Sequence, residues 1–296
     1  MNNDIQTKNS TSSNGLVEWI RTRQVATFFI LTFLISWSLW GLVFLTGSMK
    51  SLIPSGLTGV FALLVGFGPF FSASIIIKVS GNSIRSWLRQ IVTWRLKLRW
   101  YFVALGLPLL SFTIIGVIYS LYKDTSYLKG MEFEMLLFLI PLFFWNTLLG
   151  GGQEELGWRG FALPKLQNKY GALKSSLILG FFHSIWHLPM IFIANSYQAN
   201  TSFILYTVSV TAGAVLYTWL YNSTGSVLIA MILHGAGNTF PTFAILPSFN
   251  FETMEIPKIP LILEVSDAAV ALVLAIIIVI GFGAKRLTKK SETSTL

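Results

Sequence analysis

The residues best suited to chemistry begin with the stretch 150–160, GGGQEELGWRG, where two adjacent glutamates are followed by an arginine. The stretch directly follows an uncharged apolar segment, MLLFLIPLFFWNTLL. Ionisable side chains at membrane depth are energetically costly and by default indicate a functional site. Further polar groups in apolar surroundings are the three histidines of the chain and one asparagine: His183, His187, His234 and Asn238.

The spacing of these residues predicts which of them act together. Glu155 and Arg159 are four residues apart, which suits an ion pair on a helix, and His234 and Asn238 share one helical face at the same spacing. Hydrolysis of an amide needs an activated water, and a glutamate beside a neutral histidine can supply the base. Two donors on one face can stabilise the oxyanion that forms.

Each feature taken alone has a simpler explanation. A single histidine in a membrane helix can bond to a backbone carbonyl of a neighbouring helix, and Glu155 with Arg159 can be an ordinary surface ion pair. The HSIWH segment is excluded as a zincin motif because Ser184 stands where that motif requires glutamate. The combination of all these groups, in order along three apolar segments, favours a catalytic site.

Composition defines the class of protein that must position these groups. The chain is 53% hydrophobic and only 11% charged, whereas a soluble domain is about a quarter charged. The net charge of +9 therefore reports membrane topology and does not indicate nucleic-acid binding. The absence of cysteine excludes disulfides, thiolate metal ligands and a cysteine nucleophile.

The expected fold is an all-α polytopic membrane bundle of about eight transmembrane helices. Spanning the bilayer takes about 20 apolar residues, and an isolated segment in lipid must satisfy its backbone internally as a helix. The expected spans are 25–47, 57–77, 100–122, 135–152, 175–195, 201–221, 226–246 and 268–284.

Loop charges predict the orientation of the bundle. The 78–99 loop carries six basic residues and no acid, whereas the next loop toward the N-terminus has Lys50 alone. This alternation places both termini in the cytoplasm, with 78–99 along a surface of anionic lipid.

The sequence divides the chain into three parts: a disordered and interfacial flank at 1–24, one catalytic bundle at 25–284 with its motif core at about 150–240, and a basic cytoplasmic tail at 285–296. Nothing in the sequence points to an oligomeric state.

Depth along the spans predicts that the polar groups converge. His187 and His234 lie 12 and 8 residues inside spans that enter from the cytoplasm. At about 1.5 Å per residue, both are roughly 12–18 Å deep. Glu154 and Glu155 reach the same chamber if the fourth helix continues past Gly152.

The three motifs together resemble the CAAX-processing and bacteriocin-processing intramembrane proteases, also called the CPBP or Abi family. That family has Glu-Glu-x-x-x-Arg, here starting at Glu154, then Phe-x-x-x-His, here ending at His187, and His-x-x-x-Asn, here starting at His234. The resemblance covers about 150–240. One departure is His183, which stands at the phenylalanine position, so the resemblance implies that His183→Phe retains activity.

The resemblance implies peptide-bond hydrolysis near the cytoplasmic side of a membrane, and it assigns roles. Glu154 is the base and His187 its partner in holding the water. Glu155 and Arg159 orient the base, and His234 and Asn238 stabilise the oxyanion. The choice of Glu154 over Glu155 comes from the resemblance alone.

Metal and substrate stay open at this point. Glu154, His187 and His234 could form a zinc site with an open fourth position, or the same atoms could hold only water. Asn238 favours a site without metal because an amide is a poor zinc ligand.

The expected partners are membrane lipid and a membrane-associated or prenylated peptide. The expected location is a bacterial plasma membrane, with access to the site from the cytoplasm. Alternatives are a non-catalytic immunity or scaffold protein and, third, a transporter, although no internal repeat is visible.

Overall fold

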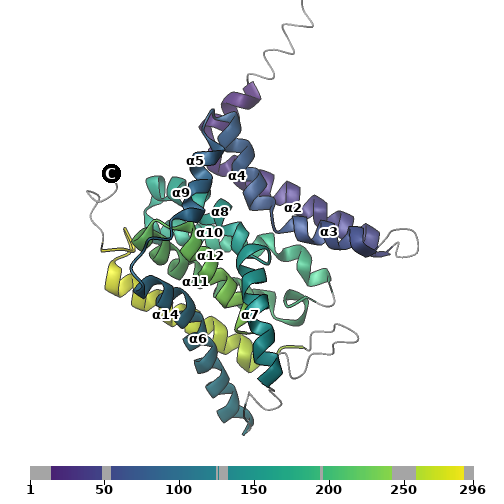
Figure 1. Cartoon of the computed structure of the whole chain (residues 1–296), viewed down its shortest axis with the longest axis vertical. Helices are drawn as coiled ribbons and strands as arrows, with labels where there is room; N and C mark the ends of the chain where they lie inside the picture. Colours follow the sequence, from purple (N-terminus) through teal and green to yellow (C-terminus); the bar gives the residue numbers. More distant parts are fainter. Residues whose placement is uncertain are drawn as a thin grey trace, which may run out of the picture.

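The computed structural model describes residues 15–48, 55–124, 126, 133–193, 196–241 and 258–289. This part of the chain is helical and contains no strand, so the all-α prediction is confirmed (Figure 1). The disorder predicted at the N-terminus falls on residues 1–14, which lie outside the described residues, as do residues 290–296 of the basic tail. The longer helices are α2 (Gln24–Ser48), α3 (Ser55–Val65), α4 (Gly68–Val79), α6 (Arg99–Lys123), α7 (Phe133–Leu148), α10 (Ala172–Trp186), α11 (Phe203–Thr224), α12 (Val227–Thr239) and α14 (Leu261–Phe282).

Within the described residues, five segments are long and apolar enough to cross a membrane: α2, α6, α10 with the turn that follows it, α11 and α14. Their outward faces are strongly apolar. Leu121 on α6 is 79% exposed and Ile280 on α14 is 80% exposed. Such surfaces are unfavourable in water over several turns but suit a hydrocarbon environment. The helices and their surfaces are those of an integral membrane protein.

The predicted second span, 57–77, is not one continuous helix. Residues 59–65 and 68–79 belong to separate helices, α3 and α4, whose axes differ by 58°. The break coincides with Gly66, Gly68 and Pro69. Proline lacks a backbone N–H and suits the first turn of a helix, so α4 starts afresh there instead of continuing α3.

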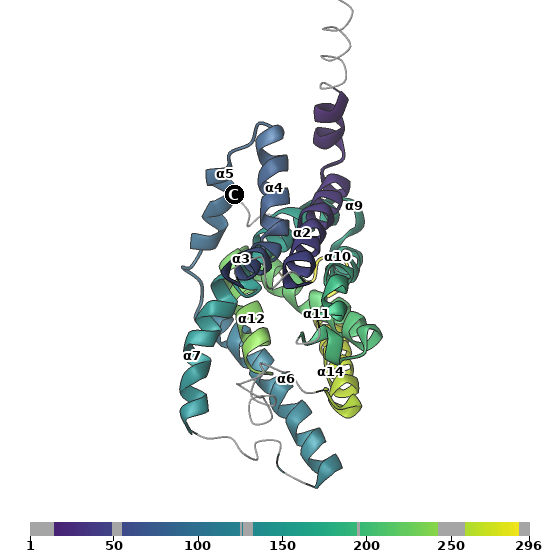
Figure 2. The same ribbon diagram turned by 90° about the vertical axis from the view of Figure 1, so that its right-hand side faces the viewer.

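Two of the predicted spans are short helices, of which α12 is mostly buried and α7 keeps an exposed apolar face. α7 has 16 residues and α12 has 13. They pack closely because Gly235 on α12 faces α7, where a Cβ atom would lie 2.0 Å from Oγ1 of Thr147. The amide of Asn146 also donates to Oγ1 of Thr239 at 3.0 Å. These contacts fix α12 beside the end of α7 (Figure 2).

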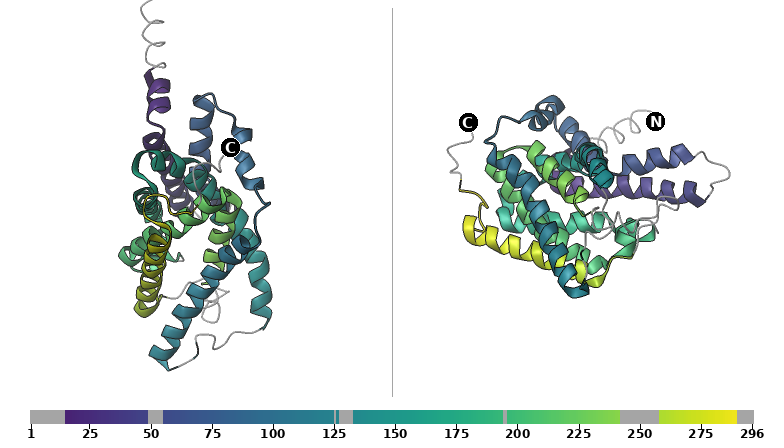
Figure 3. Two further views of the ribbon diagram at one scale, coloured as in Figure 1. Left: turned by 90° about the vertical axis from the view of Figure 1, so that its left-hand side faces the viewer. Right: turned by 60° about the horizontal axis from the view of Figure 1, so that its bottom comes forward.

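The remaining helices surround this centre. α10 packs on α11, and α11 packs on α14. α2 packs with α3 and α4, and the α2–α3 pair extends from the side of the molecule opposite α14 (Figure 3). The polar motifs singled out in the sequence therefore lie on segments that pack against several other elements.

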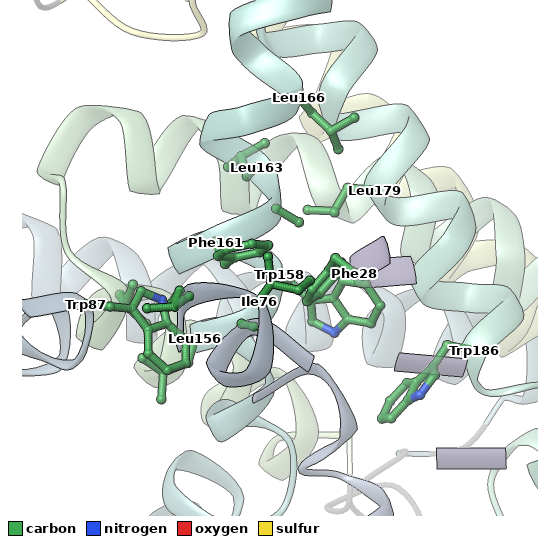
Figure 4. Close-up of a cluster of buried hydrophobic side chains, with 14 of the residues drawn as sticks. Phe28, Ile76, Trp87, Leu156, Trp158, Phe161, Leu163, Leu166, Leu179 and Trp186 are labelled. Atoms are coloured by element: carbon green, nitrogen blue, oxygen red, sulfur yellow. The ribbon is translucent and has the colours of Figure 1, made fainter. Parts of the chain in front are cut away.

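A buried aromatic cluster anchors the segment that carries the glutamates. Trp158 is fully buried, and its ring meets that of Phe28 edge-on, with centroids 5.2 Å apart (Figure 4). Phe161 from the same segment and Trp87 from the short helix α5 (Ile84–Leu88) are also buried in this cluster. Burial of large aromatic side chains on both sides of Arg159 holds the backbone of the motif against α2 and α4.

Candidate active site

The site starts where the backbone changes direction after α7. The expectation that the fourth helix continues past Gly152 is wrong, because α7 ends at Leu148. Gly151 has φ of +134°, a conformation that residues with a side chain rarely adopt. A short 3-10 turn, η2 (Gly152–Glu154), and one helical turn, α8 (Glu155–Gly157), follow. The glycines thus let the chain turn inward, and both glutamates are buried.

The motif continues through a π-helical turn, η3 (Trp158–Ala162), into α9 (Leu163–Tyr170). Such single π turns inside helical segments occur frequently at functional sites. Arg159 lies in this turn and is 2% exposed. The sequence spacing predicted its pairing with Glu155, and the structure confirms that pair.

Glu155 is the centre of a buried charge network. Nη1 of Arg159 lies 3.0 and 2.9 Å from its two carboxylate oxygens. Nδ1 of His234 lies 2.7 Å from Oε1. The guanidinium also stacks over the ring of Tyr217, with Cζ 4.3 Å from the ring centroid. A buried carboxylate needs such partners, because an unpaired buried charge is strongly unfavourable.

This network defines which nitrogen of His234 carries a proton. A carboxylate paired with an arginine is ionised and can only accept hydrogen bonds. Nδ1 of His234 is therefore the donor to Glu155, and Nε2 points away from the pair. A Cβ atom on Gly151 would lie 2.4 Å from that Nε2, so the ring approaches the glycine backbone too closely for any side chain at position 151.

Asn238 approaches the same glycine. Its amide nitrogen donates to the carbonyl oxygen of Gly150 at 2.9 Å. A Cβ atom on Gly151 would lie 2.7 Å from this nitrogen. His234 and Asn238 thus contact the glycine turn from one side of α12, as their spacing predicted.

Glu154 lies on the other side of this region and is 5% exposed. Its Oε2 is 2.9 Å from Nε2 of His183 and 3.3 Å from the indole nitrogen of Trp158. The ring of His183 packs against that of Trp158, with centroids 4.9 Å apart. Sequence reasoning assigned neither residue a role. Two four-residue spacings in the sequence could have indicated these contacts: Glu154 to Trp158, and His183 to His187.

His187 ends α10 and is half-buried. Its Nδ1 lies 3.0 Å from the backbone oxygen of His183. A carbonyl oxygen can only accept, so Nδ1 carries the proton and Nε2 keeps a free lone pair. Ligand atoms of Glu154, His183 and His187 all lie within 4.8 Å of one another.

The grouping of possible metal ligands differs from the one expected. The sequence suggested Glu154, His187 and His234, whereas the compact group in the described residues contains His183 in place of His234. One carboxylate and two imidazoles suit zinc. The hydrogen bond from Nδ1 of His187 to a carbonyl is also a common arrangement of metal-binding histidines. The residues present therefore fit a zinc ion.

Fold and site together define a class: integral membrane proteins with a buried carboxylate–imidazole centre suited to hydrolysis. Comparison with known proteins specifies the class further. Residues 136–240 match the family Type II CAAX prenyl endopeptidase Rce1-like. A CAAX prenyl protease 2 from Methanococcus maripaludis is 30% identical over 228 residues, covering 70% of this chain and 80% of the relative. The chain belongs to this family of membrane-embedded CAAX-processing proteases.

Proposed function

We propose that the chain is an intramembrane endopeptidase that hydrolyses a peptide bond of a membrane-associated or prenylated protein, with its site reached from the cytoplasmic face of a bacterial plasma membrane. The observation that supports this most directly is the separation of the two adjacent glutamates into different environments. Glu155 is held by Arg159 and His234, whereas Glu154 lies beside His183 and His187. Adjacent carboxylates with distinct partners can take distinct roles.

In the proposed reaction, Glu154 is the general base. A water donates one hydrogen to Oε1 of Glu154 and the other to Nε2 of His187, which leaves an oxygen lone pair for the scissile carbonyl carbon. As the C–O bond forms, Glu154 takes the proton from the water. Glu154 then gives this proton to the departing amine nitrogen as the C–N bond breaks.

His234 and Asn238 stabilise the negative oxygen of the tetrahedral intermediate. Nε2 of His234 donates when the ring is charged, and the Glu155–His234 contact of 2.7 Å stabilises that charge. The amide of Asn238 is the other donor. Both nitrogens pack closely against Gly151, which holds them side by side. Donors that are already in place before the reaction are the most effective form of oxyanion stabilisation.

Glu155 and Arg159 act as positioning residues. The ion pair and the stacking of Arg159 on Tyr217 fix the carboxylate that orients His234. The network joins the π turn to α11 and α12, so the oxyanion donors are held by packed helices and not by a loop. Rigid support of this kind is what preorganised sites require.

A zinc ion fits the residues of the site, and Glu154, His183 and His187 would hold it. Bound there, a zinc ion would polarise the substrate carbonyl and activate water as a Lewis acid. The roles of His234 and Asn238 are the same with or without the ion. We propose the metal-free reaction because Glu154 already has a hydrogen-bonded carboxylate oxygen and needs no metal to be held in place.

The test is cleavage of a fluorogenic peptide with a farnesylated cysteine by purified protein in detergent. Glu154→Gln keeps the shape of the side chain but removes the base, and we expect it to be inactive. Glu264→Gln is the matched control: Glu264 is also buried, but it accepts from the backbone N–H of Ser202 at 2.7 Å, which a glutamine oxygen can also do. Full activity in Glu154→Gln would contradict Glu154 as the base, whereas no cleavage by the wild-type protein would favour the scaffold or immunity alternative. The same peptide without the farnesyl group shows whether prenylation is required.

A further inference from the structure

We propose that His183 is a positioning residue that aims both groups holding the catalytic water, and this inference rests on the proposed function of Glu154 and His187. Its side chain contacts Oε2 of Glu154 at 2.9 Å. Its backbone oxygen accepts from Nδ1 of His187 at 3.0 Å. One residue of α10 therefore connects the base and its histidine partner.

The contacts on Glu154 show why its orientation matters. Nε2 of His183 and the indole N–H of Trp158 both reach Oε2. Among the described residues no donor is hydrogen-bonded to Oε1. An ionised carboxylate can only accept, so His183 must be the donor while Glu154 is a base. Two donors on Oε2 leave Oε1 as the oxygen that receives the proton from water.

The location of His183 limits the movement of this hydrogen bond. The histidine is 7% exposed, and its ring packs against Trp158 at 4.9 Å and Trp186 at 6.0 Å between centroids. These aromatic rings hold the imidazole in one orientation. A carboxyl side chain without such a fixed donor would be free to rotate, and loose placement of a catalytic group is costly for rate.

The competing explanation is that His183 only fills an aromatic wall, as a phenylalanine would. His183→Phe separates the two explanations. Phenylalanine keeps a flat ring against Trp158 and leaves the backbone oxygen that orients His187, but it has no N–H for Glu154. The family resemblance predicts that this variant is active, whereas the hydrogen bond predicts a loss.

The expected loss follows from the kind of bond that is removed. A hydrogen bond to a charged group contributes enough that its loss changes an equilibrium or rate by about 10- to 100-fold. Because His183 acts on Glu154 and touches no substrate in the proposed reaction, we expect this loss in kcat with KM changed by less than about threefold. His183→Gln restores a side-chain N–H donor, so we expect it to recover most of the kcat that His183→Phe loses.

The experiment measures kcat, KM and bound zinc for wild type, His183→Phe and His183→Gln, with folding checked by gel filtration and thermal unfolding. Phe182→Leu is the control for packing, since Phe182 is the neighbouring aromatic residue of α10 and packs on Phe29. If His183→Phe is not recovered folded, His183→Met replaces it, because methionine is of similar size and has no N–H.

A low kcat in His183→Phe, recovery in His183→Gln and little effect in Phe182→Leu would support the positioning role. Wild-type kcat in folded His183→Phe would overturn it in favour of the aromatic wall. Equal losses in the phenylalanine and glutamine variants, together with loss of a bound zinc ion, would overturn it in favour of a metal ligand. Failure of the proposed function is a separate result, seen as activity that persists in Glu154→Gln.

Discussion

The close approach of His234 and Asn238 to Gly151 makes the site sensitive to a small change, and Gly151→Ala tests the role of this contact. The added Cβ would lie 2.4 Å from Nε2 of His234 and 2.7 Å from Nδ2 of Asn238, whereas ordinary van der Waals contact begins at 3.4 Å. The imidazole would have to move by about 1 Å and the amide by slightly less. Such a displacement costs about 10²-fold in rate, and loss of one oxyanion donor costs about 10²–10³-fold.

We therefore expect kcat to fall by at least about 10³-fold in Gly151→Ala, because both donors are displaced. The backbone adds a second effect, since φ of +134° is unfavourable for alanine and strain of this kind costs about 1–3 kcal/mol. The variant should thus also unfold at lower temperature. The assay is steady-state cleavage of the farnesylated peptide by protein that elutes as a single folded species.

Gly213→Ala is the matched control. Gly213 lies within α11 and has no atom within 4 Å of a built Cβ. Alanine is favoured over glycine inside a helix by up to about 1 kcal/mol, so this variant should keep its activity and be at least as stable as wild type. If folded Gly151→Ala retains kcat within about tenfold of wild type, the positions that His234 and Asn238 take beside Gly151 do not serve the oxyanion.

Three further predictions concern the charge network, the topology and the metal. Arg159→Leu leaves Glu155 charged in the interior without its guanidinium partner, so we expect the free energy of unfolding of the variant to fall by about 3–5 kcal/mol; a loss below about 1 kcal/mol in detergent unfolding would contradict the buried network. Arg95→Cys, in a chain without native cysteine, should react with a membrane-impermeant maleimide only in opened cells, and labelling in intact cells would reverse the predicted orientation. Protein freed of zinc by a membrane-compatible chelator, with its zinc content measured, should keep most of its activity; loss of activity that zinc restores would make Glu154, His183 and His187 metal ligands.

Local properties of the sequence were sufficient for the class of fold and for much of the motif pairing. Long uncharged segments must form helices in lipid because no water is present to satisfy the backbone. The Glu155–Arg159 pair and the shared face of His234 and Asn238 depend only on helical spacing, which is the same in any protein. These features were predicted from the sequence, and the structure contains them.

The partners of Glu154 were decided by tertiary structure. α7 ends at Leu148 and the chain turns at Gly151, which no hydrophobic period indicates. This turn brings Glu154 to α10, where His183 meets it across 29 positions of sequence. Contacts between helices depend on the angle and depth at which they pack, and apolar periodicity carries no information on either. The sequence alone therefore singled out most residues of the candidate site, whereas only the packing of α7, α10 and α12 around the glycine turn determined which histidine contacts Glu154.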